Sequence, residues 1–197
     1  MNKMYKCINP IIRLVEPGNT AFPKNYDTAV ILSLTVLLAI CVKLFYSTAG
    51  PVELKWILYP TTALVNVFSS IDFWFDPDKG YVAVGIPVVI GPGCAGLNYF
   101  VIALCMSVFS FVNRYQRSKV YLFLGLTMLT YVVTLVANAS RIIAGVMMLD
   151  LSERLNFAVS STLHTVQGSL FYFIFLVAYF VALQVLFNKR RGHETVR

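Results

Sequence analysis

The chain has 197 residues, of which 58% are hydrophobic and only 13% charged, and its mean hydropathy is +0.72. Soluble domains are about half apolar and about a quarter charged, so this composition excludes a soluble globular protein. The net charge of +7 does not indicate nucleic acid binding, because the basic residues cluster beside predicted membrane spans. We expect an integral membrane protein whose environment is the lipid bilayer.

The first 28 residues are mostly polar, and we assign residues 1–28 to a cytoplasmic N-terminal tail. The apolar run 29–48 that follows is longer than the hydrophobic region of a usual signal peptide. We therefore expect a membrane span there, with signal cleavage at the small residues 47–50 as the alternative.

Four apolar stretches are long enough for helices that cross a bilayer, which takes about 20 residues. They are residues 29–48, residues 96–112, a stretch that begins at Val120, and residues 165–187. A helix from Val120 crosses ~30 Å of hydrocarbon in about 20 residues, so Arg141 should lie near the far interface. The rest of that helix should overshoot the membrane or kink.

Two segments between the first and second spans do not have the pattern of a membrane-spanning helix. Residues 56–71 are short and contain Pro60 and several polar residues, which favours an interfacial or re-entrant helix over a full crossing. A full crossing by this segment would reverse the orientation of the later helices in the membrane and put the basic cluster around Arg114 outside. Residues 72–93 contain the turn sequence DPDKG and a β-branched run, which predict a short strand or hairpin leading to Cys94.

The basic residues predict the topology. They concentrate in the N-terminal tail, in the loop around Arg114, and in residues 188–197, whereas residues 49–93 and 150–163 are net negative. Under the positive-inside rule the three basic clusters are cytoplasmic. We expect an all-α polytopic membrane protein with about four full transmembrane helices, an interfacial or re-entrant helix and a short outer β-like loop. Residues 29–187 form one transmembrane domain, and 188–197 form a basic cytoplasmic tail.

The cysteines do not suggest a disulfide scaffold or a metal site. Cys7, Cys41, Cys94 and Cys105 form no CxxC pair and no zinc-ligand spacing. Cys94 and Cys105 would lie about 16 Å apart along one helix, too far to pair. We therefore expect no metal and no cofactor, and any functional cysteine must act alone.

Cys94 is the candidate nucleophile. The tight loop before it delivers Cys94 to about the N-cap of the next helix, where the partial positive charge favours a thiolate. Gly93 and Gly96 would let a substrate backbone approach closely. The alternative is a cysteine that only packs.

Arg141 and His164 share the predicted outer face with Cys94. Arg141 could hold a thiolate, a substrate carboxylate or an oxyanion, with simple snorkelling to the interface as the alternative. His164 should lie in the first turn of the last helix, which keeps its ring neutral as a base, with an ordinary interfacial histidine as the alternative. Gly168, at i+4, indicates close approach of another helix. The aromatic residues of this helix, including Tyr172 and Tyr179, are interpreted as lipid contacts.

Three motifs in order resemble the exosortase and archaeosortase family of membrane cysteine transpeptidases. They are GPGCAG around Cys94, NASRI around Arg141, with Asn138 at its head, and HTVQG around His164. The resemblance covers residues 56–187. The chain lacks the additional N-terminal helices of typical members and resembles a compact variant such as the K-type exosortases.

The resemblance implies a catalytic triple and a substrate class. Cys94 would be the nucleophile, His164 the acid and base, and Arg141 the electrostatic stabiliser. The substrates would be exported proteins whose C-terminal sorting signal has a short motif, a transmembrane helix and a basic tail. The site would face outward from a bacterial cytoplasmic membrane. Alternatives are a non-catalytic binding, assembly or transport protein, and a quinone-linked thiol oxidoreductase, which normally needs paired cysteines.

Overall fold

The computed structural model describes residues 26–113, 118–155 and 161–194. The elements in chain order are α2 (Tyr26–Thr48), α3 (Lys55–Ser69), β1 (Phe73–Asp76), β2 (Gly80–Ala83), β3 (Val89–Ile90), the 3-10 helix η1 (Pro92–Cys94), α4 (Leu97–Phe111), α5 (Lys119–Leu155) and α6 (Ser161–Glu194). Four helical stretches are long and apolar enough to cross a membrane: Tyr26–Thr48, Pro92–Phe111, Lys119–Leu149 and Val166–Asn188. The predicted all-α multi-pass membrane fold is confirmed.

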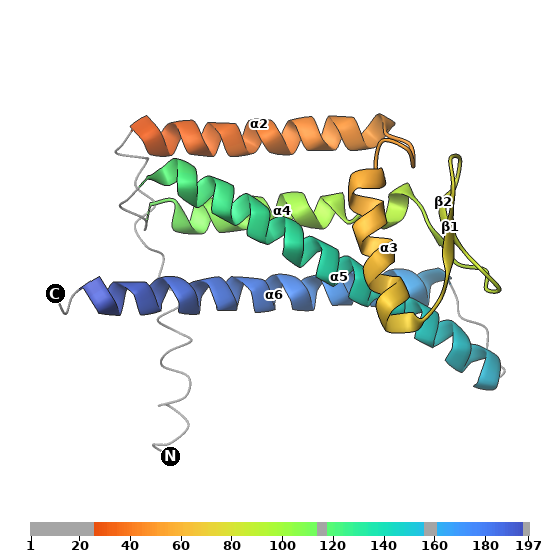
Figure 1. Cartoon of the computed structure of the whole chain (residues 1–197). Coiled ribbons are helices and arrows are strands. Elements are labelled where there is room, and N and C mark those ends of the chain that lie inside the picture. Colours follow the sequence, from red (N-terminus) through yellow and green to blue (C-terminus); the bar gives the residue numbers. More distant parts are fainter. Residues whose placement is uncertain (1–25, 114–117, 156–160, 195–197) are drawn as a thin grey trace, which may run out of the picture.

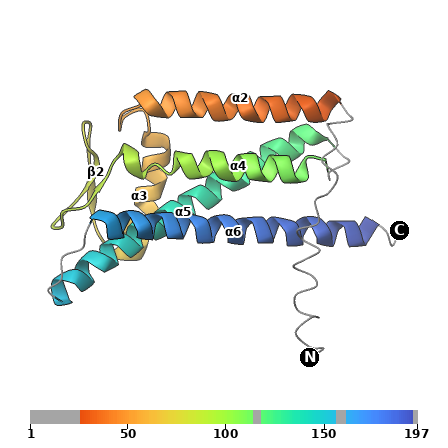
Figure 2. The ribbon, with the colours of Figure 1, turned by 180° about the vertical axis from the view of Figure 1, so that it is seen from behind.

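The long helices form a bundle that one helix crosses obliquely. In Figures 1 and 2 the axes of α2, α4 and α6 lie nearly parallel, with α2 antiparallel to α4 and α6, and α5 passes across them. α4 contacts α2, α5 and α6, and α5 also contacts α6 and α3. α5 has 37 residues, or about 55 Å, which exceeds ~30 Å of hydrocarbon. Of the two predicted outcomes, α5 therefore overshoots as one continuous helix.

α3 lies across one end of the bundle (Figure 1). Its 15 residues extend only about 22 Å, too short for a span. Ile57, Leu58 and Val65 are buried, whereas Tyr59 and Phe68 are mostly exposed. The prediction that residues 56–71 form a helix that does not cross the membrane is confirmed.

Pro60 explains how α3 attaches to α5. Proline has no backbone N–H, so within a helix it leaves the carbonyl four residues earlier, that of Trp56, without its usual donor. The Tyr131 hydroxyl of α5 donates to this carbonyl oxygen at 3.0 Å. The rings of Tyr131 and Trp56 also stack, with their centroids 5.9 Å apart. The carbonyl that Pro60 leaves without a backbone donor in α3 is thus satisfied by a contact with α5.

The predicted hairpin between α3 and α4 is a small antiparallel sheet in the order β1-β2-β3. At its first turn the Asp76 carboxylate accepts from the N–H groups of Asp78, at 2.9 Å, and Lys79, at 3.2 Å. Gly80 has a φ of +104°, and a Cβ there would lie 2.5 Å from the Ile90 carbonyl oxygen. The sheet therefore needs glycine at this position, and it leads the chain directly into η1.

Most of the predicted N-terminal tail lies outside the described residues, whereas the predicted C-terminal tail is described up to Glu194. Residues 1–25 of the N-terminal tail are among those that the structure does not describe. The backbone of α6 continues to Glu194, so most of the predicted C-terminal tail is helical. The assignment of both tails to the cytoplasm stays a prediction.

The apolar core has two clusters. One fills the middle of the bundle between α2, α4, α5 and α6 and includes Phe111 and Leu183. The other lies at the end with α3 and the sheet and includes Leu58, Ile90 and Ile142. Cys94 packs against this second cluster. Cys94 therefore lies at the end of the bundle where α3 and the sheet are.

Candidate functional site

Cys94 closes the short helix η1. Its N–H donates to the Gly91 carbonyl at 2.8 Å, and the Ala95 N–H donates to the Pro92 carbonyl at 2.9 Å. α4 begins three residues later, with Gly96 as its N-cap at a φ of +70°. The sequence predicted Cys94 at about the N-cap of this helix, and the N-cap is instead Gly96, two residues later. Pro92 starts a separate tight turn, and the left-handed Gly96 separates that turn from α4.

The two glycines beside Cys94 have different roles. Gly93 is exposed, and a Cβ there would meet nothing within 4 Å, which is compatible with the predicted approach of a substrate. Gly96 is buried, and a Cβ there would lie 3.3 Å from both Asn138 Cγ and Thr134 Cγ2. The prediction that Gly96 exposes backbone to a substrate is wrong, because α5 packs against it.

Asn138 joins α5 to the cysteine loop. Its side chain is fully buried. The amide Nδ2 donates a hydrogen bond to the Cys94 carbonyl oxygen. The amide Oδ1 accepts one from the Tyr172 hydroxyl of α6 at 2.8 Å. One buried amide therefore connects η1, α5 and α6, and a buried amide without such partners would be costly.

Arg141 lies inside the bundle, one helical turn beyond Asn138 on α5. Its guanidinium carbon is 5.2 Å from the centroid of the Tyr172 ring, within cation–π range. Its Nε is buried and has no hydrogen-bond partner among the described residues. This packing does not fit simple snorkelling. It leaves a buried donor beside the cysteine loop.

Gly168 provides the space for Arg141. A Cβ at this position would lie 3.2 Å from Arg141 Nη1 and 3.3 Å from its Cδ. The predicted close approach at Gly168 is confirmed, and the neighbour is the Arg141 side chain of α5. His164 lies one turn earlier, and its backbone is in the first turn of α6 as predicted. The side chain of His164 lies outside the described part of the structure.

Tyr172 is the central residue of the site, and the sequence interpretation missed it. Besides its contacts with Asn138 and Arg141, its ring stacks on Tyr99 with centroids 5.2 Å apart. Through Asn138 its hydroxyl is linked to the Cys94 carbonyl oxygen, while its ring packs against the Arg141 guanidinium. Cys94 and Arg141 are thus brought together around Tyr172.

The interpretation of the α6 aromatic residues as lipid contacts is wrong for Tyr172 and Tyr179. Tyr179 is 6% exposed, and its hydroxyl is bonded to Ser107 and Thr130. One signal was present in the sequence. Gly168, Tyr172 and Tyr179 follow at spacings of four and seven, which places them on one face of the helix.

α2 supplies two further contacts that sequence reasoning missed. The Tyr46 hydroxyl donates to the Pro92 carbonyl at 3.1 Å. Lys43 Nζ donates to Asn98 Oδ1 at 2.7 Å, in the first turn of α4. Both hydrogen bonds connect α2 to the segment around Cys94. No motif around Tyr46 or Lys43 marked them in advance.

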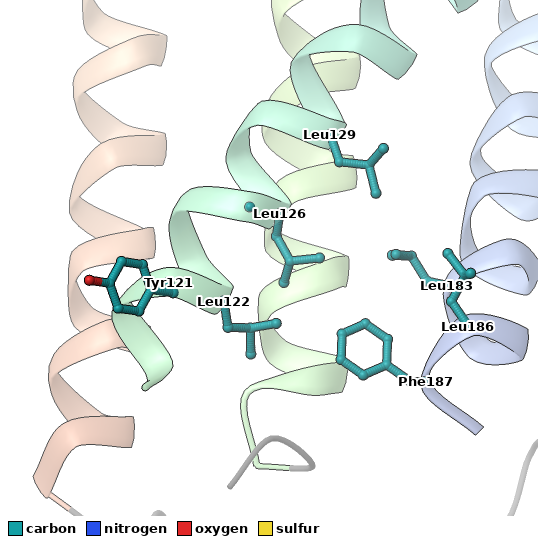
Figure 3. Close-up of a pocket in the computed structure, with 8 residues that line it drawn as sticks. Tyr121, Leu122, Leu126, Leu129, Leu183, Leu186 and Phe187 are labelled. Carbon is teal, nitrogen blue, oxygen red and sulfur yellow. The ribbon is translucent and has the colours of Figure 1, made fainter. Parts of the chain in front are cut away.

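Two adjoining apolar cavities lie between α5 and α6. Figure 3 shows one, of about 250 Å³, with Leu122, Leu126 and Leu129 of α5 near Leu183 and Phe187 of α6. The other, of about 340 Å³, continues along the same helices to Val136 and Phe175. Apart from Tyr121 and Tyr179, the side chains that line them are hydrocarbon, and none is a thiol, an imidazole or a charged group.

Neither a metal centre nor a cysteine pair is evident in the described residues. No group of three or more His, Cys, Asp or Glu side chains there could hold a metal ion. Cys41, Cys94 and Cys105 are free thiols. The reactive groups that the described part of the chain brings together are therefore the Cys94 thiol and the Arg141 guanidinium.

Comparison of the chain with protein-family models, with curated proteins and with solved structures gave no match. A functional interpretation must therefore be argued from the residues of this site and their geometry.

Proposed function

We propose that the protein is a membrane cysteine transpeptidase, similar to exosortases and archaeosortases, that cleaves C-terminal sorting signals of exported proteins. One observation carries the proposal. Cys94 and Arg141, from different helices, are linked through Asn138 and Tyr172 at the bundle end where α6 begins, with His164 in its first turn. A thiol, a buried cationic donor and a histidine-bearing helix start are the parts that acyl transfer needs.

The arrangement of the helix ends supports an outward-facing site. The start of α2, the end of α4, the start of α5 and the end of α6 share the bundle end opposite α3 and the sheet (Figures 1 and 2). The basic clusters of the sequence adjoin these same ends. Under the positive-inside rule that end is cytoplasmic, so Cys94 faces outward from a bacterial cytoplasmic membrane.

In the proposed reaction His164 takes the proton of the Cys94 thiol, and the resulting thiolate attacks a backbone carbonyl carbon of the substrate. The developing oxyanion is stabilised by Arg141, whose Nε has no hydrogen-bond partner among the described residues. The C–N bond then breaks, His164 protonates the departing amine, and a thioester remains on Cys94. An amine or water, deprotonated with the help of His164, attacks the thioester and releases the thiolate. No metal or redox step is required.

The position of the site suits a substrate anchored in the same membrane. The transmembrane helix of a sorting signal would lie beside the bundle, and its basic tail would stay at the cytoplasmic end. The scissile bond would then lie where the substrate leaves the bilayer, at the level of η1. Gly93, exposed and with open space around it, allows a backbone to come close to Cys94.

Mass spectrometry of co-expressed exported proteins tests the proposal. The wild type should remove the C-terminal segment of a substrate, Cys94→Ala should not, and Arg141→Ala should do so much more slowly. Cys105→Ala is the matched control, because Cys105 is also half-buried and lies on the adjoining helix. Processing of one substrate at equal rates by the wild type and Cys94→Ala would contradict a cysteine transpeptidase.

A further inference from the structure

The Tyr172 hydroxyl determines which way the Asn138 amide faces. An asparagine amide has an accepting oxygen at one end and a donating NH₂ at the other. Tyr172 donates to the oxygen at 2.8 Å, so the NH₂ is turned toward the Cys94 carbonyl. Asn138 is fully buried, so no bulk water competes for either end. Without the hydroxyl, the amide would lose the contact that fixes its orientation.

The Tyr172 ring acts on a different group. It is held in place by its stacking on Tyr99, which is 4% exposed. The Arg141 guanidinium lies 5.2 Å from the ring centroid, and Gly168 leaves the space for it on α6. The ring thus provides a fixed surface for Arg141, as aromatic rings commonly do for guanidinium groups.

We propose that Tyr172 is a positioning residue that sets the placement of Cys94 relative to Arg141. Its hydroxyl acts on the cysteine loop through Asn138, and its ring acts directly on the guanidinium. The inference rests on the proposed function, because it assigns these contacts to the arrangement of a nucleophile and its stabilising cation. The two actions are separable, since Tyr172→Phe removes only the hydroxyl and Tyr172→Leu removes the ring as well.

The first test measures access to Cys94 and does not depend on catalysis. Variants whose only cysteine is Cys94 are treated with N-ethylmaleimide in native membranes, and the rate of labelling is followed by mass spectrometry. Cys94 is half-buried, so release of its loop should expose the thiol. We expect Tyr172→Phe to label about threefold faster or more, as local opening becomes more frequent. Labelling at the unchanged rate would overturn the inference.

Tyr179→Phe is the matched control. Tyr179 lies two turns further along α6 and is also buried, and its hydroxyl is bonded to Ser107 and Thr130. We expect its loss to leave Cys94 labelling unchanged. A variant whose only cysteine is Cys105 reports general loosening of α4, and Tyr172→Phe should not change its labelling. Equal acceleration in either control would show a merely structural effect and overturn the inference.

The double variant tests whether the hydroxyl acts through Asn138. If it does, Asn138→Ala with Tyr172→Phe should label Cys94 no faster than Asn138→Ala alone, because residues in one network are not additive. Multiplication of the two separate effects would overturn this route. Asn138→Ala also keeps the link testable if Tyr172→Phe gives too little folded protein.

Kinetics on a processed substrate give the second readout. Tyr172→Phe should lower kcat about tenfold and leave KM unchanged, because it disturbs the nucleophile and not the substrate contacts. Tyr172→Leu should lower kcat further. A rise in KM with unchanged kcat would overturn the positioning role. Equal processing by Cys94→Ala would contradict the proposed function alone, since the labelling experiment still decides whether Tyr172 controls Cys94.

Discussion

The Tyr131 hydroxyl occupies the hydrogen-bonding place that Pro60 leaves open in α3, 3.0 Å from the Trp56 carbonyl oxygen. A proline that weakens the helix therefore fixes the helix to its neighbour. α3 packs against β2 as well as α5, so this contact also stabilises the sheet that leads to η1.

Tyr131→Phe should lower the free energy of unfolding by about 1 kcal/mol, because it removes this hydrogen bond and keeps the stacked ring. In a Pro60→Ala background the cost should shrink, since the alanine N–H introduced at position 60 can satisfy the Trp56 carbonyl. Thermal unfolding in detergent measures both. An equal loss of stability in the two backgrounds would contradict this account of Pro60.

Gly96→Ala should destabilise the protein. The left-handed backbone at Gly96 costs a residue with a Cβ about 1–2 kcal/mol, and the new methyl group would lie 3.3 Å from Asn138 and Thr134. Because Asn138 must shift, Cys94 labelling should also accelerate. Gly93→Ala is the control, with unchanged thermal stability because a Cβ there meets nothing within 4 Å. Similar melting temperatures for the two variants would count against the assigned role of Gly96.

Gly168→Ala should lower processing about tenfold, equivalent to about 1.4 kcal/mol, with little change in stability. The new Cβ would lie 3.2 Å from Arg141 Nη1, and the flexible side chain can yield by leaving the Tyr172 ring. Gly125→Ala on α5, where a Cβ meets nothing within 4 Å, is the control. If the proposed processing activity of Gly168→Ala has the wild-type kcat, the position of the guanidinium is unimportant.

Labelling with a membrane-impermeant maleimide in intact cells should reach cysteine at the end of the bundle that carries the sheet. We expect labelling of a variant whose only cysteine is at Asp78→Cys, in the exposed turn between β1 and β2. A variant with Lys189→Cys should label only after the cells are opened, because basic flanks stay cytoplasmic. The reverse pattern would place Cys94 inside and contradict the proposed cleavage of exported proteins.

The elements themselves were largely predictable because local signals specify them. Apolar length identified the four spans, and Pro60 with the shortness of its segment identified α3 as a helix that does not cross. The turn around Asp76 and Gly80 predicted the hairpin. The N-cap of α4 was misplaced, because the left-handed backbone of Gly96 follows from its contact with α5, which no local pattern records.

The sequence by itself determined at which end of the bundle Cys94 and Arg141 lie. Each crossing of the bilayer reverses direction, so the number of spans and the basic clusters decide the end for every residue. It could not determine which side chains meet there. A polar stripe on α5, which includes Thr130, Thr134 and Asn138, marks a face that turns inward, but it does not show which residues of α6 that face meets.

Only the tertiary structure decided that Tyr172 meets Asn138 and Arg141 while its neighbours on α6, Phe173 and Ile174, are mostly exposed. The decision depends on the rotation of α6 and the oblique course of α5, which set the faces that oppose each other. Gly96 and Gly168 belong to these opposing faces, since at each of them a neighbouring side chain lies 3.2–3.3 Å from where a Cβ would be. Membrane crossing thus assigned residues to one end, and side-chain packing joined them into a site.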